Sequence, residues 1–190
     1  PTEEGDLYEV DMQLRPSGKS GPVAVRLSRF QDYYAQSAWT WELMALTRAR
    51  VVLGDPDLTQ SLDNAVRDAL MVPRDLAQIF VDSVAMRERM RAARGVAPAW
   101  DLKHRPGGLI DIEFIAQTLQ LAGLQAGQDV RRSSTFDALT ALGEAGLLPR
   151  EDAQTLCEIG RLYLGLMQLI RTAHGSGYDL AMASRGFATR

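Results

Sequence analysis

Apolar residues recur every three to four positions through most of the chain, which is the spacing of amphipathic helices. The clearest run begins at Leu109 and continues through Ile112, Ala116 and Leu119. Comparable runs predict further helices that begin near Ser28, Trp39, Asp57, Arg74, Ser134 and Arg150. Short loops between long amphipathic helices favour an antiparallel bundle. We therefore expect a mainly α chain.

The front of the chain has a different period. Val10, Met12 and Leu14 alternate with polar residues, which predicts a strand with one buried face that ends before Pro16. Residues 23–27 predict a second short strand, which would pair with the first as a hairpin. The predicted organisation is therefore strands in residues 1–27, followed by a helical bundle domain in residues 28–190.

Composition narrows the class of protein. The chain has 190 residues, 46% of them hydrophobic, and a net charge of -3, which suits a globular domain and gives no sign of a general nucleic-acid binder. No apolar run reaches the roughly 20 residues that span a bilayer, so we expect no membrane partner. Cys157 is the only cysteine, which rules out an intramolecular disulfide and favours a cytoplasmic location. Because the chain starts at Pro1 without Met, we expect a fragment.

Two acids and several basic residues mark the front of the chain. Glu9 and Asp11 are two residues apart, so on a strand they share one side and could hold a divalent metal against a phosphate. A solvated strand face explains the same pattern. Arg15 and Arg48 belong to a group of basic residues that could meet phosphates, or could be ordinary surface charges.

A second candidate site lies at residues 101–114, in the middle of the chain. Lys103 precedes Gly107 and Gly108, which lead directly into the Leu109 helix. Free backbone N–H groups and the positive end of a helix attract anions, so Lys103 is a candidate phosphate ligand. The spacing is not that of a Walker A loop. Structural roles remain open: Asp111 could complement the helix dipole and Glu113 could pair with an arginine.

Several ordered segments together resemble one enzyme family. They are residues 7–18, 38–42, 45–52, 54–56, 101–103 and 107–114, and they resemble the glutamine synthetase adenylyltransferases. The tryptophan-rich segment around Trp39 and Trp41 resembles the adenylylating half of these enzymes. A PII uridylyltransferase is a related alternative because it shares a similar Gly-Gly motif, but the tryptophan-rich segment argues against it.

The resemblance implies a nucleotidyltransferase of the DNA polymerase beta superfamily, and the front strands would then be the end of its α/β domain. Such enzymes move AMP from ATP, with Mg²⁺, to a tyrosine of glutamine synthetase. Asp11 matches the third catalytic and metal-binding carboxylate, with Glu9 as a weaker metal ligand and Arg15 as a phosphate contact. Gln13 stands where the family commonly has Arg. The Gly-Ser…Asp-x-Asp motif of the first two carboxylates is absent, so this chain is expected to be inactive alone.

An alternative for this chain is a binding module. In that interpretation the helical part recognises glutamine synthetase, the PII signalling protein or glutamine as an effector. The turn at Lys103, Gly107 and Gly108 would then face the catalytic cleft or couple it to the bundle, with Asp111 and Glu113 as interdomain contacts.

Overall fold

The computed structural model describes residues 11–98 and 100–174, and this part of the chain is mainly helical, as expected. No helix within it is both long enough and apolar enough to cross a membrane. The elements of the described residues are a short 3-10 helix, η1, and seven α-helices: η1 Gly18–Ser20, α1 Leu27–Gln36, α2 Thr40–Leu46, α3 Pro56–Met71, α4 Leu76–Arg94, α5 Leu109–Gln125, α6 Thr135–Glu144 and α7 Arg150–His174.

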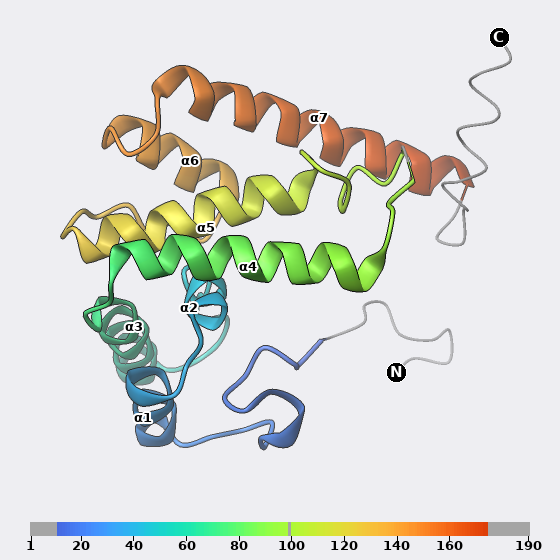
Figure 1. Ribbon diagram of the computed structural model, residues 1–190. Coiled ribbons are helices and arrows are strands. Elements are labelled where there is room, and N and C mark those ends of the chain that lie inside the picture. Colours follow the sequence, from blue (N-terminus) through green and yellow to red (C-terminus); the bar gives the residue numbers. More distant parts are fainter. Residues whose placement is uncertain (1–10, 99, 175–190) are drawn as a thin grey trace, which may run out of the picture.

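Helix α5 is the centre of the fold. Figure 1 shows α4 and α5 side by side and running in opposite directions, with α6 and α7 on the other side of α5 and α1–α3 grouped near the start of α4. Two hydrophobic clusters meet on α5: Leu121 packs with Leu43 and Leu70, and Ile112 packs with Leu139. This central position explains why α5 is apolar around most of its circumference.

Local capping signals set several helix boundaries. Ser134 caps α6 as expected, because its hydroxyl oxygen accepts a hydrogen bond from the backbone N–H of Asp137 at 3.4 Å. The capping residue of helix α3 lies two residues earlier than the sequence predicts: Asp55, and not Asp57, accepts a hydrogen bond from the N–H of Leu58 at 2.8 Å. Pro56 then fills the first helical position, where its missing N–H has no cost.

Two expectations about the helices are wrong. The apolar spacing of Leu43, Leu46, Ala49 and Val52 predicts a helix as far as Val52, but α2 ends at Leu46 and Val52 is 81% exposed. The buried Thr47 hydroxyl donates a hydrogen bond to the carbonyl of Met44 at 2.6 Å where the helix stops. Apolar spacing along α4 predicts that Phe80 faces the core together with Ile79 and Ser83; the latter two are buried, but Phe80 is 44% exposed. The Ser83 hydroxyl lies 2.7 Å from that of Thr118 on α5, which satisfies both buried groups.

The expected strands are not found in the described residues. The second one is wrong, since residues 23–26 form bends and loop and Leu27 begins α1. Of the first, residues 7–10 lie outside the described part and residues 11–14 are not in a strand. A strand needs a neighbour to bond its backbone groups, and no other strand is present among the described residues to supply one. The boundary between residues 27 and 28 stays a prediction.

Candidate functional site

The N-terminal segment, defined as residues 11–26, carries the expected catalytic carboxylate. Asp11 is exposed, and its Oδ1 accepts a hydrogen bond from the backbone N–H of Gln13 at 2.8 Å. Glu9 lies outside the described residues. Within the described residues, no three His, Cys, Asp or Glu side chains gather as a metal site. Since Mg²⁺ needs a nearly octahedral set of oxygens, Asp11 alone does not make a magnesium site.

Arg15 folds back on its own segment. Its Nε and Nη2 atoms both donate hydrogen bonds to the carbonyl of Gly21 at 3.2 Å, and Nη1 donates to the carbonyl of Met12. The turn between them is tight, because Ser17 has a φ of 64° and a Cβ on Gly21 would lie 2.1 Å from the carbonyl oxygen of Pro16. Arg15, which the sequence suggested as a phosphate contact, is therefore held by hydrogen bonds within its own segment.

A cleft opens where the N-terminal segment meets α2, α4 and α5. Its volume is about 680 Å³, and its wall is part apolar and part charged. Charged lining residues come from four places along the chain: Arg15 from the segment, Glu42 from α2, Arg48 from just after α2, and Glu113 from α5. The apolar lining includes Met86 and Met90 of α4. In this cleft, residues of the N-terminal segment and of the central helix α5 line the same space.

Glu42 fixes one side of this cleft. It is buried, and its carboxylate accepts hydrogen bonds from the Tyr33 hydroxyl at 2.8 and 3.0 Å and from the backbone N–H of Trp39 at 2.9 Å. Burial and the bond to Glu42 raise the pKa of Tyr33, and burial raises the pKa of the neighbouring Tyr34 to about 12. Both phenols are thus kept protonated, and Glu42 orients α2 with no free carboxylate oxygen left for chemistry.

Glu113 pairs with an arginine, as one of the two sequence interpretations held. The partner is Arg48, whose Nη1 lies 3.2 Å from Glu113 Oε1. Their side chains are 41% and 36% exposed, so the pair contributes at most about 1 kcal/mol to stability. Its effect is to place one positive and one negative group on the cleft wall, within reach of solvent.

The connection from α4 to α5 contains the junction loop, defined as residues 101–108. Arg87 and Arg91 of α4 both bind the Asp111 carboxylate, Arg87 through Nε and Arg91 through Nη2 at 3.2 Å. The backbone N–H of Gly107 donates to Asp111 Oδ2 at 2.6 Å. Burial raises the pKa of Asp111, but the bonds from Arg87 and Gly107 outweigh it and leave the pKa lowered. Asp111 is therefore a structural anion that joins α4, the loop and α5.

Asp101 does the same at the start of the loop. Its Oδ1 accepts from the backbone N–H of His104 at 3.1 Å and lies 2.9 Å from His104 Nδ1, while Arg94 Nη2 reaches its Oδ2 at 3.3 Å. Burial raises the pKa of Asp101, but the contacts with His104 and Arg94 together outweigh burial and leave the pKa lowered. Both ends of the loop are thus anchored by carboxylates.

The expected anion site at the start of α5 is closed by the chain itself. The backbone N–H of Leu109 donates to the carbonyl of Leu102 at 2.9 Å, and that of Ile110 to the carbonyl of Lys103 at 3.1 Å. Gly108 is required because a Cβ there would lie 2.7 Å from the Leu102 carbonyl oxygen. The Lys103 side chain is exposed. The glycine pair is thus explained by backbone packing, without a ligand.

Sequence reasoning did not identify the arginines that hold this loop. From the sequence alone, the arginines in the last turns of this helix, Arg87, Arg89, Arg91 and Arg94, are explained as charges that complement the negative end of the helix dipole. The spacing of Arg87, Arg91 and Arg94 by four and three residues places them on one helix face, toward the loop, whereas Arg89 lies off that face and is exposed. This spacing, together with Asp101 and Asp111 beyond the helix end, was the sequence signal that could have predicted the ion pairs.

Two family models match different parts of the chain. Residues 1–65 match the model described as Glutamate-ammonia ligase adenylyltransferase, and residues 74–175 match the model described as GlnD PII-uridylyltransferase. The cleft takes Arg15 and Arg48 from the first match and Glu113 from the second.

Curated relatives cover both matched parts at once. A protein of Caulobacter vibrioides is 46% identical over 188 residues, which is 98% of this chain and 19% of the relative. Proteins of Rhodopseudomonas palustris (strain TIE-1) and Bradyrhizobium diazoefficiens are each 45% identical over 170 residues, 90% of this chain and 17% of the relative. All three are named bifunctional glutamine synthetase adenylyltransferase/adenylyl-removing enzyme. The chain thus spans less than a fifth of their length, and the uridylyltransferase alternative is not favoured.

Proposed function

This chain belongs to the glutamine synthetase adenylyltransferase family, and we propose that it joins the catalytic domain to the helical domain of such an enzyme. The proposed activity of the whole enzyme is transfer of AMP from ATP to a tyrosine hydroxyl of glutamine synthetase, in the cytoplasm. The observation that carries the proposal is the cleft of about 680 Å³, because residues of both family matches line it.

The reaction places defined demands on the residues of this chain. The tyrosine oxygen attacks the α-phosphorus of ATP, the bond from that phosphorus to the pyrophosphate oxygen breaks, and pyrophosphate leaves. Asp11 is proposed as the carboxylate that accepts the tyrosine proton and completes the metal site with Glu9. Mg²⁺, when bound, would neutralise phosphate charge, together with Arg15 and Lys103.

Residues 7–14 are proposed to pair as a strand in the whole enzyme. Residues 7–14 alternate in polarity, as a half-buried strand does, yet residues 11–14 have no strand partner among the described residues. Pairing with a polymerase beta-like sheet elsewhere in the enzyme would satisfy these backbone groups and present Asp11 on one strand face. In that arrangement the strand would end at residue 14, directly before Arg15, which lines the cleft.

The substitution Asp11→Asn in the whole enzyme tests the catalytic proposal. We expect adenylylation to fall by at least about a hundredfold through kcat, since a general base contributes about 10²–10⁴-fold. A matched control is Asp32→Asn, because Asp32 is an exposed carboxylate on α1. Circular dichroism should show both variants folded. Unchanged kcat in Asp11→Asn would remove this residue from the site.

The 190-residue chain alone provides a second test. Because it lacks the Gly-Ser…Asp-x-Asp motif, we expect no AMP transfer from radiolabelled ATP to glutamine synthetase above a no-enzyme blank. Robust transfer by the isolated chain would overturn the proposed division of the catalytic site between this chain and the rest of the enzyme.

The helical part is proposed to contact regulators as well. The match of residues 74–175 to a PII-uridylyltransferase model favours PII as a protein partner of this region, with glutamine synthetase as substrate and glutamine as a small effector. Calorimetric titration of the chain with PII, glutamine synthetase and glutamine in turn would separate these partners. Heat from none of the three would leave the helical part with a connecting role only.

A further inference from the structure

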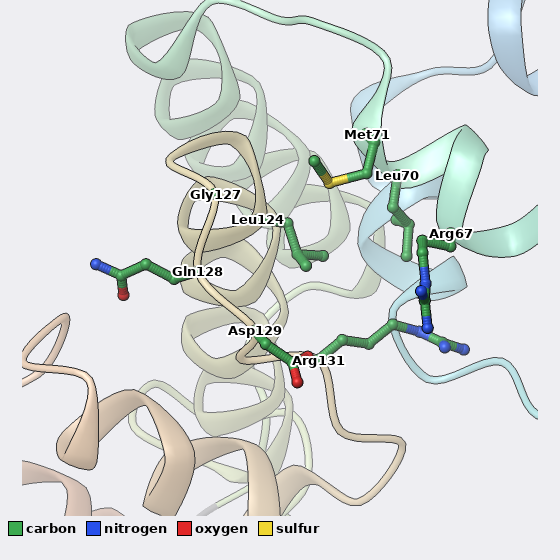
Figure 2. A pocket seen from close by; sticks show the side chains of 8 residues that line it. All are labelled: Arg67, Leu70, Met71, Leu124, Gly127, Gln128, Asp129 and Arg131. Carbon is green, nitrogen blue, oxygen red and sulfur yellow. The ribbon is translucent and has the colours of Figure 1, made fainter. Parts of the chain in front are cut away.

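A second pocket lies at the opposite end of α5 from the cleft. Its volume is about 380 Å³, and it opens between the second half of α3, the end of α5 and the loop after it. Figure 2 shows the side chains of Arg67 from α3 and Arg131 from the loop approaching each other, with Leu70 next to Arg67 and Leu124 of α5 farther away. The chemistry proposed for the cleft uses none of these residues.

The Arg131 side chain is held in place by one hydrogen bond, while its Nε has no hydrogen-bond partner. Its Nη2 donates a hydrogen bond to the carbonyl of Ala49 at 2.5 Å, which anchors the guanidinium across the gap to the loop after α2. Its Nε is buried and has no hydrogen-bond partner. Buried polar atoms in folded proteins are nearly always bonded, so an unpartnered N–H beside a pocket indicates a missing acceptor. The anchoring bond means that this donor is already oriented before any ligand arrives.

Arg67 adds a second positive charge at the same place. Burial lowers the pKa of Arg131, and the nearby charge of Arg67 lowers it further, while the charge of Asp63 opposes both effects. Among the described residues, no carboxylate forms an ion pair with either guanidinium. Asp129 also lines the pocket, but its ion pair is with Arg132, at 3.8 Å. Asp63 acts on Arg131 through its charge but forms no ion pair with it, so the two guanidinium groups still lack a directly bonded anion, which a bound oxyanion would supply.

We infer that this pocket binds the oxyanion group of a small molecule, a carboxylate or a phosphate, between Arg67 and Arg131. Guanidinium groups present paired N–H donors that match both kinds of oxyanion. Leu70 and Leu124 supply an apolar floor for the uncharged part of the ligand. This inference does not depend on the function proposed for the cleft.

Titration of the 190-residue chain with sodium phosphate and with sodium acetate, at constant pH and ionic strength, tests the inference. The ¹H–¹⁵N signal of Arg131 Nε is the readout, and circular dichroism checks that each protein is folded. We expect a saturable shift with at least one anion. A response to phosphate alone identifies a phosphorylated ligand, whereas a response to acetate, with or without phosphate, identifies a carboxylate. No saturable shift with either anion overturns the inference.

Variants separate a built site from general attraction to a basic surface. Arg67→Gln is expected to weaken binding by at least about tenfold, and because Arg67 is exposed this change leaves the fold intact. Arg131→Lys keeps the charge but loses the paired donors, and a similar weakening is expected. The control is Arg89→Gln, an exposed arginine near the far end of α4, with no change expected. Equal weakening in the control would also overturn the inference.

Discussion

The junction loop and the N-terminal segment are built from similar residues, yet they stand in different relations to the helical core. Next to the junction loop, charges meet partners from another element, since Asp111 of α5 is bound by Arg87 and Arg91 of α4. In the N-terminal segment, Arg15 makes its hydrogen bonds to Met12 and Gly21 of the same segment. The first arrangement ties two helices together, and the second only closes a turn.

The charged side chains of the two regions differ in burial as well as in their bonding partners. The Arg87 and Asp111 side chains are 8% and 16% exposed, so removing one partner leaves a charge that water cannot fully solvate. Asp11 is exposed, and its loss would leave nothing buried behind. Arg87 and Asp111 therefore contribute to the stability of the fold, while the Asp11 carboxylate of the segment can be replaced without that cost.

The largest effect is expected for Arg87→Ala. Because this change leaves the Asp111 carboxylate with Arg91 alone as its charged partner, we expect a loss of about 3 kcal/mol in the free energy of unfolding. Urea unfolding followed by circular dichroism measures it. The control Arg89→Ala should change stability by no more than about 0.5 kcal/mol, and an equal loss in both variants would show that the buried pair is not special.

A matched pair of glycine substitutions comes next. Gly108→Ala is expected to cost about 2 kcal/mol in unfolding free energy, because the new Cβ would meet three backbone carbonyls of the anchored loop. Gly21→Ala creates a closer clash, 2.1 Å from the Pro16 carbonyl oxygen, yet should cost under about 1 kcal/mol because the segment can shift. The opposite ranking in urea unfolding would mean that the segment is part of the cooperative core.

Acid should weaken the junction loop in a predictable direction. The pKa of Asp111 is lowered below its ordinary 3.8, so its contribution is present above about pH 4 and is lost as pH falls through the lower, folded-state pKa. The stability gap between wild type and Asp111→Asn should therefore shrink below pH 4, by about 1.4 kcal/mol for each unit by which the pKa is lowered. Denaturant curves between pH 2.5 and 7 measure this gap, and a constant gap would contradict the assignment.

The smallest effect is expected for Arg15→Gln. Since Arg15 bonds only to carbonyls of its own segment, the free energy of unfolding should change by less than about 0.5 kcal/mol. The same urea assay applies, with Arg87→Ala as the opposite extreme. A loss above about 1.5 kcal/mol would place the segment within the fold and remove the contrast between the two regions.

The sequence predicted the parts of the fold that local signals determine. Helix α6 follows Ser134 and stops before Gly146, and α7 runs over Arg150–His174, because capping residues and apolar spacing agree there. The early end of α2 was not predictable, since it coincides with a buried contact of Thr47 that no spacing reveals. The predicted strands depend on neighbours that the described residues do not include.

The candidate site was predictable in its residue types more than in its pairings. An arginine partner for Glu113 was one expected outcome, but that Arg48 supplies it depends on how α2 packs against α5. Asp111 was recognised as unusual, whereas its arginines lie 24 and 20 residues earlier and become neighbours only when α4 and α5 fold side by side. The catalytic role of Asp11 and the metal role of Glu9 stay predictions.

The close packing around Gly108 also sets where this chain can change in length during evolution. The carbonyls of Leu102, Lys103 and Arg105 all converge on one Cα, so a residue inserted into or deleted from the junction loop would break the register between α4 and α5. Just before it, Val96 is fully exposed in the turn that leaves α4. Related chains should therefore show insertions and deletions before Asp101, and a constant number of residues from there to Asp111.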